Sequence, residues 1–199
     1  MNKNLPQSLF NWHSLACVGV IAALALSLPA FSEGSDVKNT AEKSAMTHRR
    51  AVADVMDAQG KSLGKADFTE TAQGVLIHAQ LSGVPEGWHG FHVHAVGQCD
   101  PKAAKGAFTS AGGHFNPAGK EHGFENPKGM HVGDLPNVYV EKDGKLLTET
   151  LLQGATLESG PTALLDKDGS ALVIHSTKDD YASDPAGNAG SRIACGVIQ

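Results

Sequence analysis

The stretch GVLIHAQL, residues 74–81, carries the pattern that decides the fold. Apolar side chains occupy every second position and would share one face of an extended chain: Val75, Ile77, Ala79 and Leu81. The positions between them carry Leu76, His78 and Gln80, which would point to the opposite face. Alternation of this kind over a short run predicts a half-buried β-strand.

Four further stretches alternate in a similar way and end at turn residues. They are AVADVMD (51–57), VYVEKDGKLLTETLL (138–152), SALVIH (170–175) and RIACGVI (192–198). Asp143-Gly144 and Asp168-Gly169 are typical of tight turns between antiparallel strands. No window shows the period of an amphipathic helix, so the sequence predicts an all-β sandwich or barrel.

Two long segments rich in glycine and proline interrupt the predicted strands, at about residues 97–136 and 176–191. Segments of this length inside a compact domain usually carry function. Of the 199 residues, 41% are hydrophobic and 19% are charged, which leaves room for one substantial core. We therefore expect one domain, at residues 49–199, with two functional loops.

The first 32 residues have the plan of a secretory signal peptide. Lys3 precedes the apolar run CVGVIAALALSLPA (17–30), and the small residues Ala30 and Ser32 offer cleavage sites. The run is shorter than the roughly 20 apolar residues of a membrane-spanning helix. Residues 33–48 are polar and have no period, which predicts a flexible leader. We expect an exported domain with no membrane segment after cleavage.

Removal of the signal changes the counts of charge and cysteine. The whole chain has 16 basic and 21 acidic residues, and loss of Lys3 makes the net charge −6 with histidine neutral. No basic stripe stands out that would bind phosphate groups, so no nucleic-acid partner is expected. Of the three cysteines, Cys99 and Cys195 remain, a number that suits one disulfide in an oxidising compartment.

The segment HFNPAGKEHGFENPKGMHVGD, residues 114–134, has little to bury but carries four potential metal ligands. At intervals of eight, nine and three residues it presents His114, His122, His131 and Asp134. Three imidazoles and one carboxylate make a closed tetrahedral set suited to structural zinc. Because metal binding to an unformed site contributes folding free energy, zinc would order this loop.

A second set of histidines lies on predicted strands. In GFHVH (90–94), period two would place His92 and His94 on one face, as a ligand pair for one metal. His175 ends the run ALVIH and could point into the same region. Copper favours four nitrogens, and His114 would complete the set if its two ring nitrogens served two metals. His89 has an odd offset from His92, and we expect it to be structural.

Together these motifs resemble those of the copper/zinc superoxide dismutases, specifically the exported bacterial branch. The likeness rests on HGFHVH, on HFNP followed by a histidine and HVGDLPN, on GNAGSRIACGVI, and on the lone histidine that ends a strand between them. It runs from about Ala51 to the C-terminus. The resemblance implies a Greek-key β-sandwich or flattened barrel of immunoglobulin-like architecture, located in the periplasm.

The resemblance also implies a role for each candidate residue. Copper would be held by His92, His94, His114 and His175. Zinc would be held by His114, His122, His131 and Asp134, with His114 as the bridge. Asp179 would link a copper histidine to a zinc histidine as an outer carboxylate. Cys99 and Cys195 would form the disulfide, and Arg192 would hold the anionic substrate near copper.

The implied activity is dismutation of superoxide to molecular oxygen and hydrogen peroxide. As the resemblance implies, one superoxide would give its electron to Cu(II) and leave as O₂ while His114 takes a proton. A second superoxide would take the electron from Cu(I), receive that proton and one from water, and leave as hydrogen peroxide. Two alternatives are an exported copper and zinc binding or delivery module without turnover, and a zinc hydrolase with zinc on His92, His94 and His175. The full ligand set and Arg192 favour the dismutase, and the hydrolase lacks an evident general base.

This chain departs from the eukaryotic pattern of the family in both loops. Residues 176–191 form a shorter segment that lacks that pattern's glutamate and lysine cluster, and Ala186 stands where the eukaryotic channel has threonine. Residues 100–113 form a longer segment that brings Lys102 and Lys105. We hypothesise that these lysines supply part of the field that draws superoxide to a negative protein, a steering effect known for superoxide dismutases. The sequence leaves monomer and homodimer both open.

Overall fold

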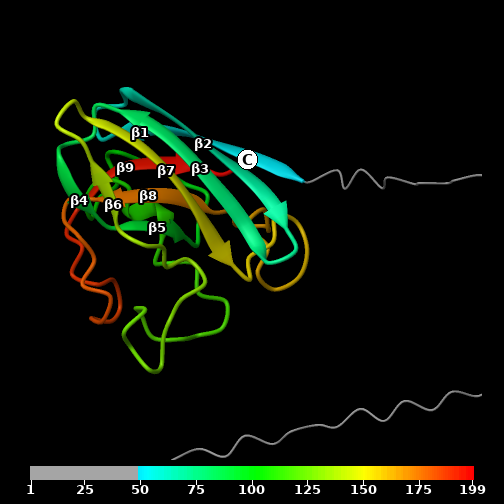
Figure 1. Ribbon diagram of the computed structural model, residues 1–199. Helices are drawn as coiled ribbons and strands as arrows, with labels where there is room; N and C mark the ends of the chain where they lie inside the picture. Colours follow the sequence, from blue (N-terminus) through cyan, green and yellow to red (C-terminus); the bar gives the residue numbers. More distant parts are fainter. Residues whose placement is uncertain (1–48) are drawn as a thin grey trace, which may run out of the picture. The chain divides into compact units, whose positions relative to one another are not determined.

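This computed structural model describes residues 49–199, which form nine β-strands and one short 3-10 turn (Figure 1). The predicted signal peptide (1–32) and leader (33–48) lie outside the described residues. Across the described part, no helix has the length and apolar character needed to span a membrane.

Seven antiparallel strands form a large sheet in the order β5-β8-β9-β1-β2-β3-β7. Their bounds are β1 Arg50–Asp57, β2 Ser62–Thr71, β3 Gly74–Ser82, β5 Phe91–His94, β7 Lys145–Gln153, β8 Ala171–His175 and β9 Arg192–Val197. Two shorter strands, β4 Gly87–His89 and β6 Val138–Val140, form a second sheet. Neighbours such as β3 and β7 are far apart in the chain, as in a Greek key.

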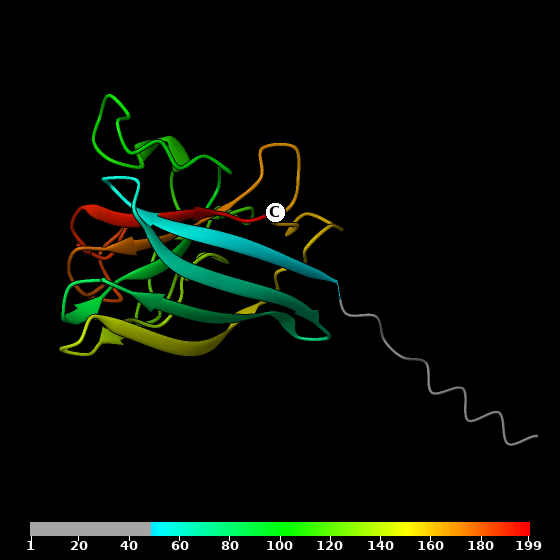
Figure 2. The same ribbon diagram turned by 90° about the horizontal axis from the view of Figure 1, so that it is seen from above.

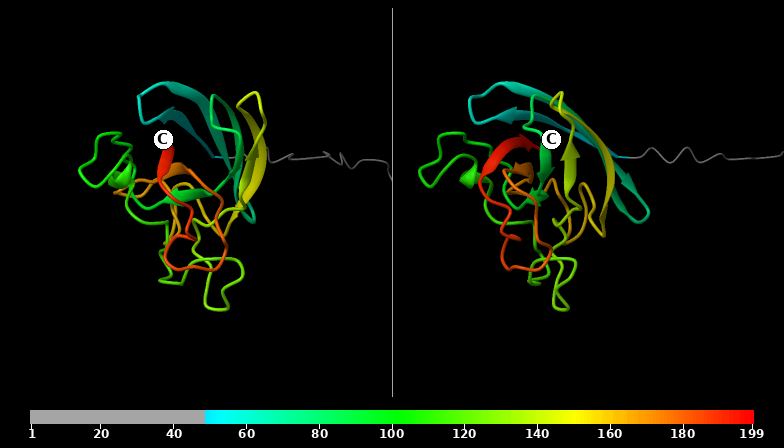
Figure 3. Two further views of the ribbon diagram at one scale, coloured as in Figure 1. Left: turned by 90° about the vertical axis from the view of Figure 1, so that its left-hand side faces the viewer. Right: turned by 60° about the vertical axis from the view of Figure 1, so that its left-hand side comes forward.

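The large sheet curls around its core and forms part of a barrel (Figures 2 and 3). The extended segment that contains β4 and β5 takes part in both sheets, because β4 pairs with β6 and β5 pairs with β8. Gly90 separates the two strands, and a Cβ there would lie 2.8 Å from the Cβ of Ala189. This close approach requires glycine. The all-β Greek-key prediction is confirmed.

The alternation in residues 74–81 corresponds to the burial in β3. Val75, Ile77 and Ala79 are fully buried, whereas His78 and Gln80 are exposed. Burial of one large aliphatic side chain contributes about 1.5–3 kcal/mol relative to exposure. The same rule applies on β5, where Phe91 and Val93 join the main core and the histidines between and after them are left for other contacts.

The strand β2 was missed by the sequence analysis because its alternation changes phase. Leu63 and Ala66 are both buried although they are three residues apart. Gly64 lies between them with φ of 139°, opposite an irregularity in β1 after Val55. A bulge of this kind moves the following side chains to the other face, so the period-two signal is lost.

One of the two predicted hairpin turns is also wrong. Asp143-Gly144 joins β6 to β7 as expected. Asp168-Gly169 lies instead in an irregular connection between β7 and β8. There the carboxylate of Asp166 accepts hydrogen bonds from both backbone N–H groups, at 3.0 and 2.9 Å. Asp168-Gly169 thus belongs to a turn that the Asp166 side chain closes within a loop, and not to a hairpin between paired strands.

The two predicted functional loops are present as long connections. Residues 95–137 link β5 to β6 and contain the 3-10 turn Thr109–Ala111, and residues 176–191 link β8 to β9. The yellow-green part of the first loop and the orange-red second loop extend on the same side of the sheet, whereas the green part with the 3-10 turn projects elsewhere (Figures 1 and 3). Hydrogen bonds tie them together, since the backbone N–H of Glu125 donates to the carbonyl of Tyr181 at 3.0 Å.

Candidate metal centre

The candidate ligands are positioned by β5, by the end of β8 and by the two loops. In the antiparallel pairing of β5 with β8, His92 lies opposite Val173. His175 is the last residue of β8. Short β-bridges then join β5 to the first loop, at His94 with His114 and at His92 with Asp134. Backbone hydrogen bonding therefore fixes where the loop residues stand.

Three groups of side chains in residues 49–199 place their ligand atoms within 4.8 Å of one another. We call the group of His114, His122, His131 and Asp134 the loop group. We call the group of His92, His94, His114 and His175 the strand group. The third group contains His92, His122 and Asp179. His114 is a member of both the loop group and the strand group, and all these side chains are buried.

The loop group has the dimensions of a tetrahedral zinc site. The Nδ1 atoms of its three histidines lie 2.9, 3.0 and 3.1 Å from Oδ1 of Asp134. The Nδ1 atoms of His131 and His114 are 3.3 Å apart. Zinc with ligands at about 2.0–2.1 Å gives a tetrahedron with edges of roughly 3.3 Å. The four ligand atoms therefore fit zinc.

The second oxygen of Asp134 fixes the orientation of this carboxylate. It accepts hydrogen bonds from the backbone N–H groups of Gly123 and His131, both at 3.0 Å. Burial alone would raise the pKa of Asp134, but the histidine and backbone hydrogen bonds outweigh it and hold the pKa far below the usual range. The side chain is thus an ionised ligand at any physiological pH.

In the strand group, hydrogen bonds to one ring nitrogen leave the other nitrogen free to bind metal. Nδ1 of His94 faces the carbonyl of Gly112 at 3.0 Å, and Nδ1 of His175 faces that of Gly190 at 3.3 Å. Nε2 of His92 faces the Asp179 carboxylate at 2.7 Å. Such outer partners commonly set the tautomer of ligating imidazoles.

Two ring nitrogens of the strand group are buried without a hydrogen-bond partner. They are Nδ1 of His92 and Nε2 of His114, and Ser170 Oγ is the other such side-chain atom in the described part of the chain. Unsatisfied buried polar atoms are rare and call for an explanation such as an ion. Four imidazole nitrogens fit copper, so the strand group fits the metal that the sequence predicts.

The electrostatics favour neutral imidazoles in the strand group. Burial, reinforced by neighbouring positive charge, lowers the pKa of His94 well below its usual value. Burial also lowers the pKa of His114 to about 4 and that of His175 to about 3. At neutral pH these rings have a lone pair to offer, which is the form that binds metal.

Asp179 contacts one histidine of the strand group and one histidine of the loop group. Its carboxylate lies 2.7 Å from Nε2 of His92 and 3.0 Å from Nε2 of His122. Burial lowers the pKa of His122, but hydrogen bonds with Asp134 and Asp179 outweigh this and raise it to about 9 in the metal-free chain. His89 stands apart from the groups, with its ring between the carbonyls of His175 and Pro85, which agrees with a structural residue.

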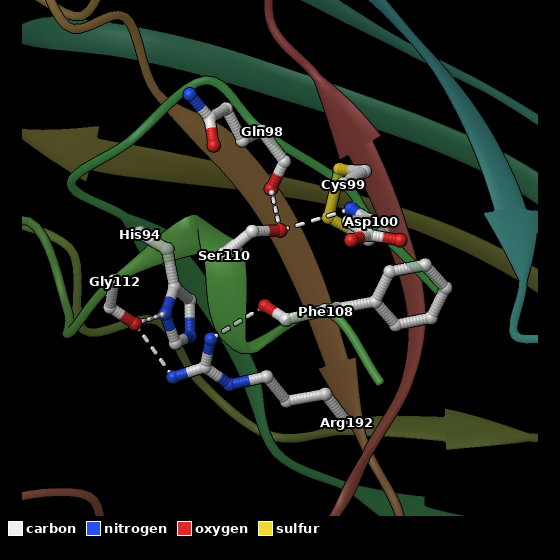
Figure 4. Close-up of a disulfide and its surroundings, with 9 residues drawn as sticks. His94, Gln98, Cys99, Asp100, Phe108, Ser110, Gly112 and Arg192 are labelled. Carbon is white, nitrogen blue, oxygen red and sulfur yellow. Dashed lines mark hydrogen bonds between the residues drawn. A yellow bond between two sulfur atoms is a disulfide. The ribbon is translucent and has the colours of Figure 1, made fainter. Parts of the chain in front are cut away.

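Cys99 and Cys195 form a disulfide, so the predicted pairing is confirmed (Figure 4). The bond joins the first loop to β9, three residues after Arg192. The Arg192 guanidinium donates from Nη1 to the carbonyl of Phe108 at 2.7 Å and from Nη2 to that of Gly112 at 2.6 Å. The disulfide and the guanidinium thus hold the same loop against the same strand.

A cavity of about 300 Å³ gives access to the strand group. It is lined by His94, Gly113, His114, Asn116, His131, His175, Pro185, Ala186 and Arg192. An adjacent cavity of about 200 Å³ is lined by Lys105 and Arg192 with backbone-rich loop residues. Lys105 therefore lines a cavity together with Arg192, whereas Lys102 does not line it.

Sequence reasoning missed the groups that support Asp179 and Arg192. Arg192 binds backbone carbonyls, which every residue has, so the sequence carries no signal for them. Asn137 and Tyr181 contact Asp179 through hydrogen bonds to and from the backbone. The one hint that the sequence offers is that Asn137 closes the motif HVGDLPN and that Tyr181 stands two residues after Asp179.

Comparison with known proteins gives a consistent family. The model of the family described as copper/zinc superoxide dismutase (SODC) matches residues 62–198. Cu-Zn superoxide dismutase 2 of Aquifex aeolicus is 47% identical over 152 residues, which span 75% of this chain and 86% of that protein. The superoxide dismutase-like protein YojM of Bacillus subtilis is 40% identical over 164 residues, 81% of this chain and 80% of its own length.

Solved structures show the same relationship. A SOD-like protein from Bacillus subtilis superposes with a TM-score of 0.69 at 38% identity, covering 74% of this chain and 97% of that one. The Cu/Zn superoxide dismutase of Brucella abortus superposes with a TM-score of 0.61 at 28% identity, covering 76% of this chain and all of the other. Sequence match, fold and metal-ligand geometry agree: this chain belongs to the copper/zinc superoxide dismutase family.

Proposed function

We propose that this protein dismutates superoxide with copper on the strand group and zinc on the loop group. The observation that carries the proposal is the double membership of His114. Its Nδ1 lies within the loop group, and its buried Nε2 faces the strand group without a hydrogen-bond partner. One imidazole can therefore contact two metals. The family supplies the expectation of copper and zinc, and the ligand chemistry of each group suits its metal.

When bound, copper would supply the one-electron exchange that lets two superoxide ions and two protons become one molecule of oxygen and one of hydrogen peroxide. The chain supplies the rest. Zinc has no redox role; the loop group gives it four ligands, so it would order the loop and fix the position of His114.

Arg192 is the residue that we assign to substrate binding. Two of its N–H groups are fixed by carbonyls of the first loop, while the side chain lines the cavity that leads to the strand group. Burial lowers the pKa of Arg192, but a guanidinium stays charged at physiological pH. Its remaining N–H groups can donate to a small anion in the cavity.

His114 is the residue that we assign to proton transfer. Its Nε2 is buried without a hydrogen-bond partner, and the residue lines the cavity beside the strand group. When this nitrogen is not bound to copper, it can hold a proton and deliver it to the reduced substrate.

The test is superoxide consumption by the oxidised 33–199 protein loaded with both metals, compared with the same protein after copper removal. Fast, copper-dependent loss of superoxide with formation of hydrogen peroxide is the expected result. The alternative is a copper and zinc binding or delivery module without turnover. A sample with both metals bound and no turnover would establish that alternative. A zinc hydrolase would show no Cu(II) absorption band.

We propose further that the protein acts in the periplasm, since residues 1–32 have the sequence plan of a secretory signal peptide. Residues 1–32 would be removed, residues 33–48 would form a flexible leader, and residues 49–199 would be the catalytic domain. N-terminal sequencing of the protein purified from a periplasmic extract tests this. A sequence that begins after Ala30 or Ser32 is expected, and an intact Met1 would contradict export.

The partner that we propose besides superoxide is a second copy of the chain. Trp88, Phe124 and Tyr139 are exposed by 56%, 41% and 41%, and ring contacts join Trp88 to Tyr139 and Phe124 to Tyr181. Exposed aromatic clusters commonly mark contact surfaces. A groove between the two pairs is lined by charges of both signs, which a two-fold contact can pair. Sedimentation of the wild type and of Trp88→Ser would decide between monomer and dimer.

A further inference from the structure

Asp179 lies in a loop and not in a strand, so its position depends on contacts with other parts of the chain. It lies in the loop of residues 176–191, four residues after β8 ends. Its carboxylate nevertheless reaches one histidine of each metal group, at 2.7 and 3.0 Å. An outer carboxylate orients ligands only if it is itself immobile. The hydrogen bonds to Asp179 from outside this loop are therefore informative.

Asn137 binds the backbone of Asp179 from both sides. Its Nδ2 donates to the Asp179 carbonyl at 2.9 Å, and its Oδ1 accepts from the Asp179 N–H at 2.7 Å. Asn137 immediately precedes β6, whose pairing with β4 fixes the start of this strand. The reciprocal pair thus ties Asp179 to the edge of a sheet rather than to another mobile loop.

Tyr181 fixes the carboxylate of Asp179 and connects it to the same asparagine. Its backbone N–H donates to Oδ1 of Asp179 at 2.6 Å, and its phenolic oxygen accepts from the Asn137 N–H at 2.7 Å. On the opposite side Gly187 leaves no room for movement, because a Cβ there would lie 1.9 Å from Oδ1 of Asp179. The carboxylate is enclosed between these neighbours.

We propose that Asn137, supported by Tyr181, is a positioning residue for both metal groups. It acts through Asp179, because it contacts the backbone of Asp179 and none of the metal-ligand side chains in the hydrogen bonds of the described chain. The inference rests on the proposed function, since it presumes that the two groups bind metal. It gives a role to the last residue of the motif HVGDLPN, to which the sequence analysis assigned none.

The position of Asn137 makes this role testable without loss of the fold. The residue is half-buried and lines an open groove of about 450 Å³, together with Trp88, Glu125, Lys178, Asp179, Asp180 and Tyr181. Water can therefore fill the space that a smaller side chain leaves, and Asn137→Ala creates no sealed cavity. Tyr181→Phe removes only the phenolic oxygen and gives a second, milder variant.

The experiment is a double-mutant cycle on zinc affinity, with Asn137→Ala, Asp179→Ala and the double variant in the oxidised, copper-free protein. Competition with a chelator of known affinity gives the dissociation constant for zinc alone. Loss of an outer partner typically costs 10–100-fold in metal affinity, and we expect Asn137→Ala to weaken zinc binding by about tenfold. In the Asp179→Ala background the same substitution should have almost no effect, because no carboxylate remains to be positioned.

Asn126→Ala is the matched control. This asparagine lies in the first loop, between His122 and His131. Its side chain donates to Glu121 and accepts from the N–H of Lys128, and it makes no hydrogen bond with Asp179. It should leave the zinc dissociation constant within about twofold of the wild-type value, and Tyr181→Phe should shift it in the same direction as Asn137→Ala. The Cu(II) absorption band of the copper-loaded protein gives a second readout, and it should shift in Asn137→Ala but not in Asn126→Ala.

Each outcome of the cycle has one meaning. Equal losses from Asn137→Ala with and without Asp179 would show that Asn137 merely stabilises the loop, and the positioning role would be wrong. An unchanged zinc constant in the single variant would overturn it as well. A wild-type protein that fails to bind zinc would instead overturn the proposed metal centre itself, so the two failures are distinguishable.

Discussion

Oδ2 of Asp179 lies 2.7 Å from Nε2 of His92, although 87 residues separate the two in the chain. The contact fixes the tautomer of His92 so that Nδ1 faces the strand group. The same carboxylate contacts His122 of the loop group. The occupancy of one metal site should therefore affect the other through a single side chain as well as through His114.

Replacement of this carboxylate should weaken both sites. Asp179→Asn keeps the shape of the side chain but removes its charge and one of its acceptor oxygens, and we expect a loss of 10–100-fold in copper and zinc affinity. Asp180→Asn is the control, because Asp180 is exposed and bonds only its own loop. Metal competition assays on both variants measure the effect. Equal affinities in the two variants would show that Asp179 does not support the ligands.

Zinc binding should release a proton near neutral pH. The pKa of His122 is raised to about 9 in the metal-free chain, so this ring is protonated at pH 7 and must lose a proton before Nδ1 can bind zinc. Affinity should then rise about tenfold per pH unit from pH 7 and level off above about pH 9. Calorimetry in two buffers of different ionisation enthalpy counts the protons. A pH-independent affinity would contradict the assignment of His122.

Arg192→Lys should lower the rate of dismutation without loss of metal. Lysine keeps the positive charge but cannot bond two carbonyls and an anion in the geometry of a guanidinium. Since hydrogen bonds to charged groups contribute about 1.5–3 kcal/mol, a decrease of roughly 10–100-fold is expected for Arg192→Ala and a smaller one for lysine. Pulse radiolysis with metal analysis measures both quantities. Variants as fast as wild type would exclude Arg192 from substrate binding.

The steering hypothesis is now sharper for one of the two lysines. Lys105 lines a cavity with Arg192, so Lys105→Glu should lower the rate at low salt and make the rate less sensitive to added salt. Lys102→Glu serves as the matched charge change on the same loop and should have the smaller effect. The double variant should be slowest. Identical rates and salt slopes in all of them would end the hypothesis.

Loss of the disulfide should cost stability and activity together. The two cysteines are 96 residues apart, and loop-entropy estimates for a closure of this size give about 4–5 kcal/mol. Cys99→Ser with Cys195→Ser also frees the loop whose carbonyls hold Arg192. Urea unfolding and turnover at full metal loading measure the two effects. Full activity in the double variant would show that Arg192 holds its place without the bond.

The sequence predicted the metal ligands better than the strands around them. The candidate ligands His114, His122, His131 and Asp134 are recognised because few residue types bind metal and these four stand together in one short segment with little to bury. The strand β2 escaped recognition because the bulge near Gly64 changes the phase of its alternation. Asn137 stands in the motif HVGDLPN, but its role could not be predicted, since the sequence does not show that its side chain bonds a backbone 42 residues away.

The carbonyl of Gly112 is an acceptor for both His94 and Arg192 (Figure 4). One oxygen atom thus holds two side chains that come from different strands, the candidate metal ligand His94 on β5 and Arg192 on β9. A change in the position of this carbonyl would therefore disturb both side chains at once, although neither belongs to the loop that carries it.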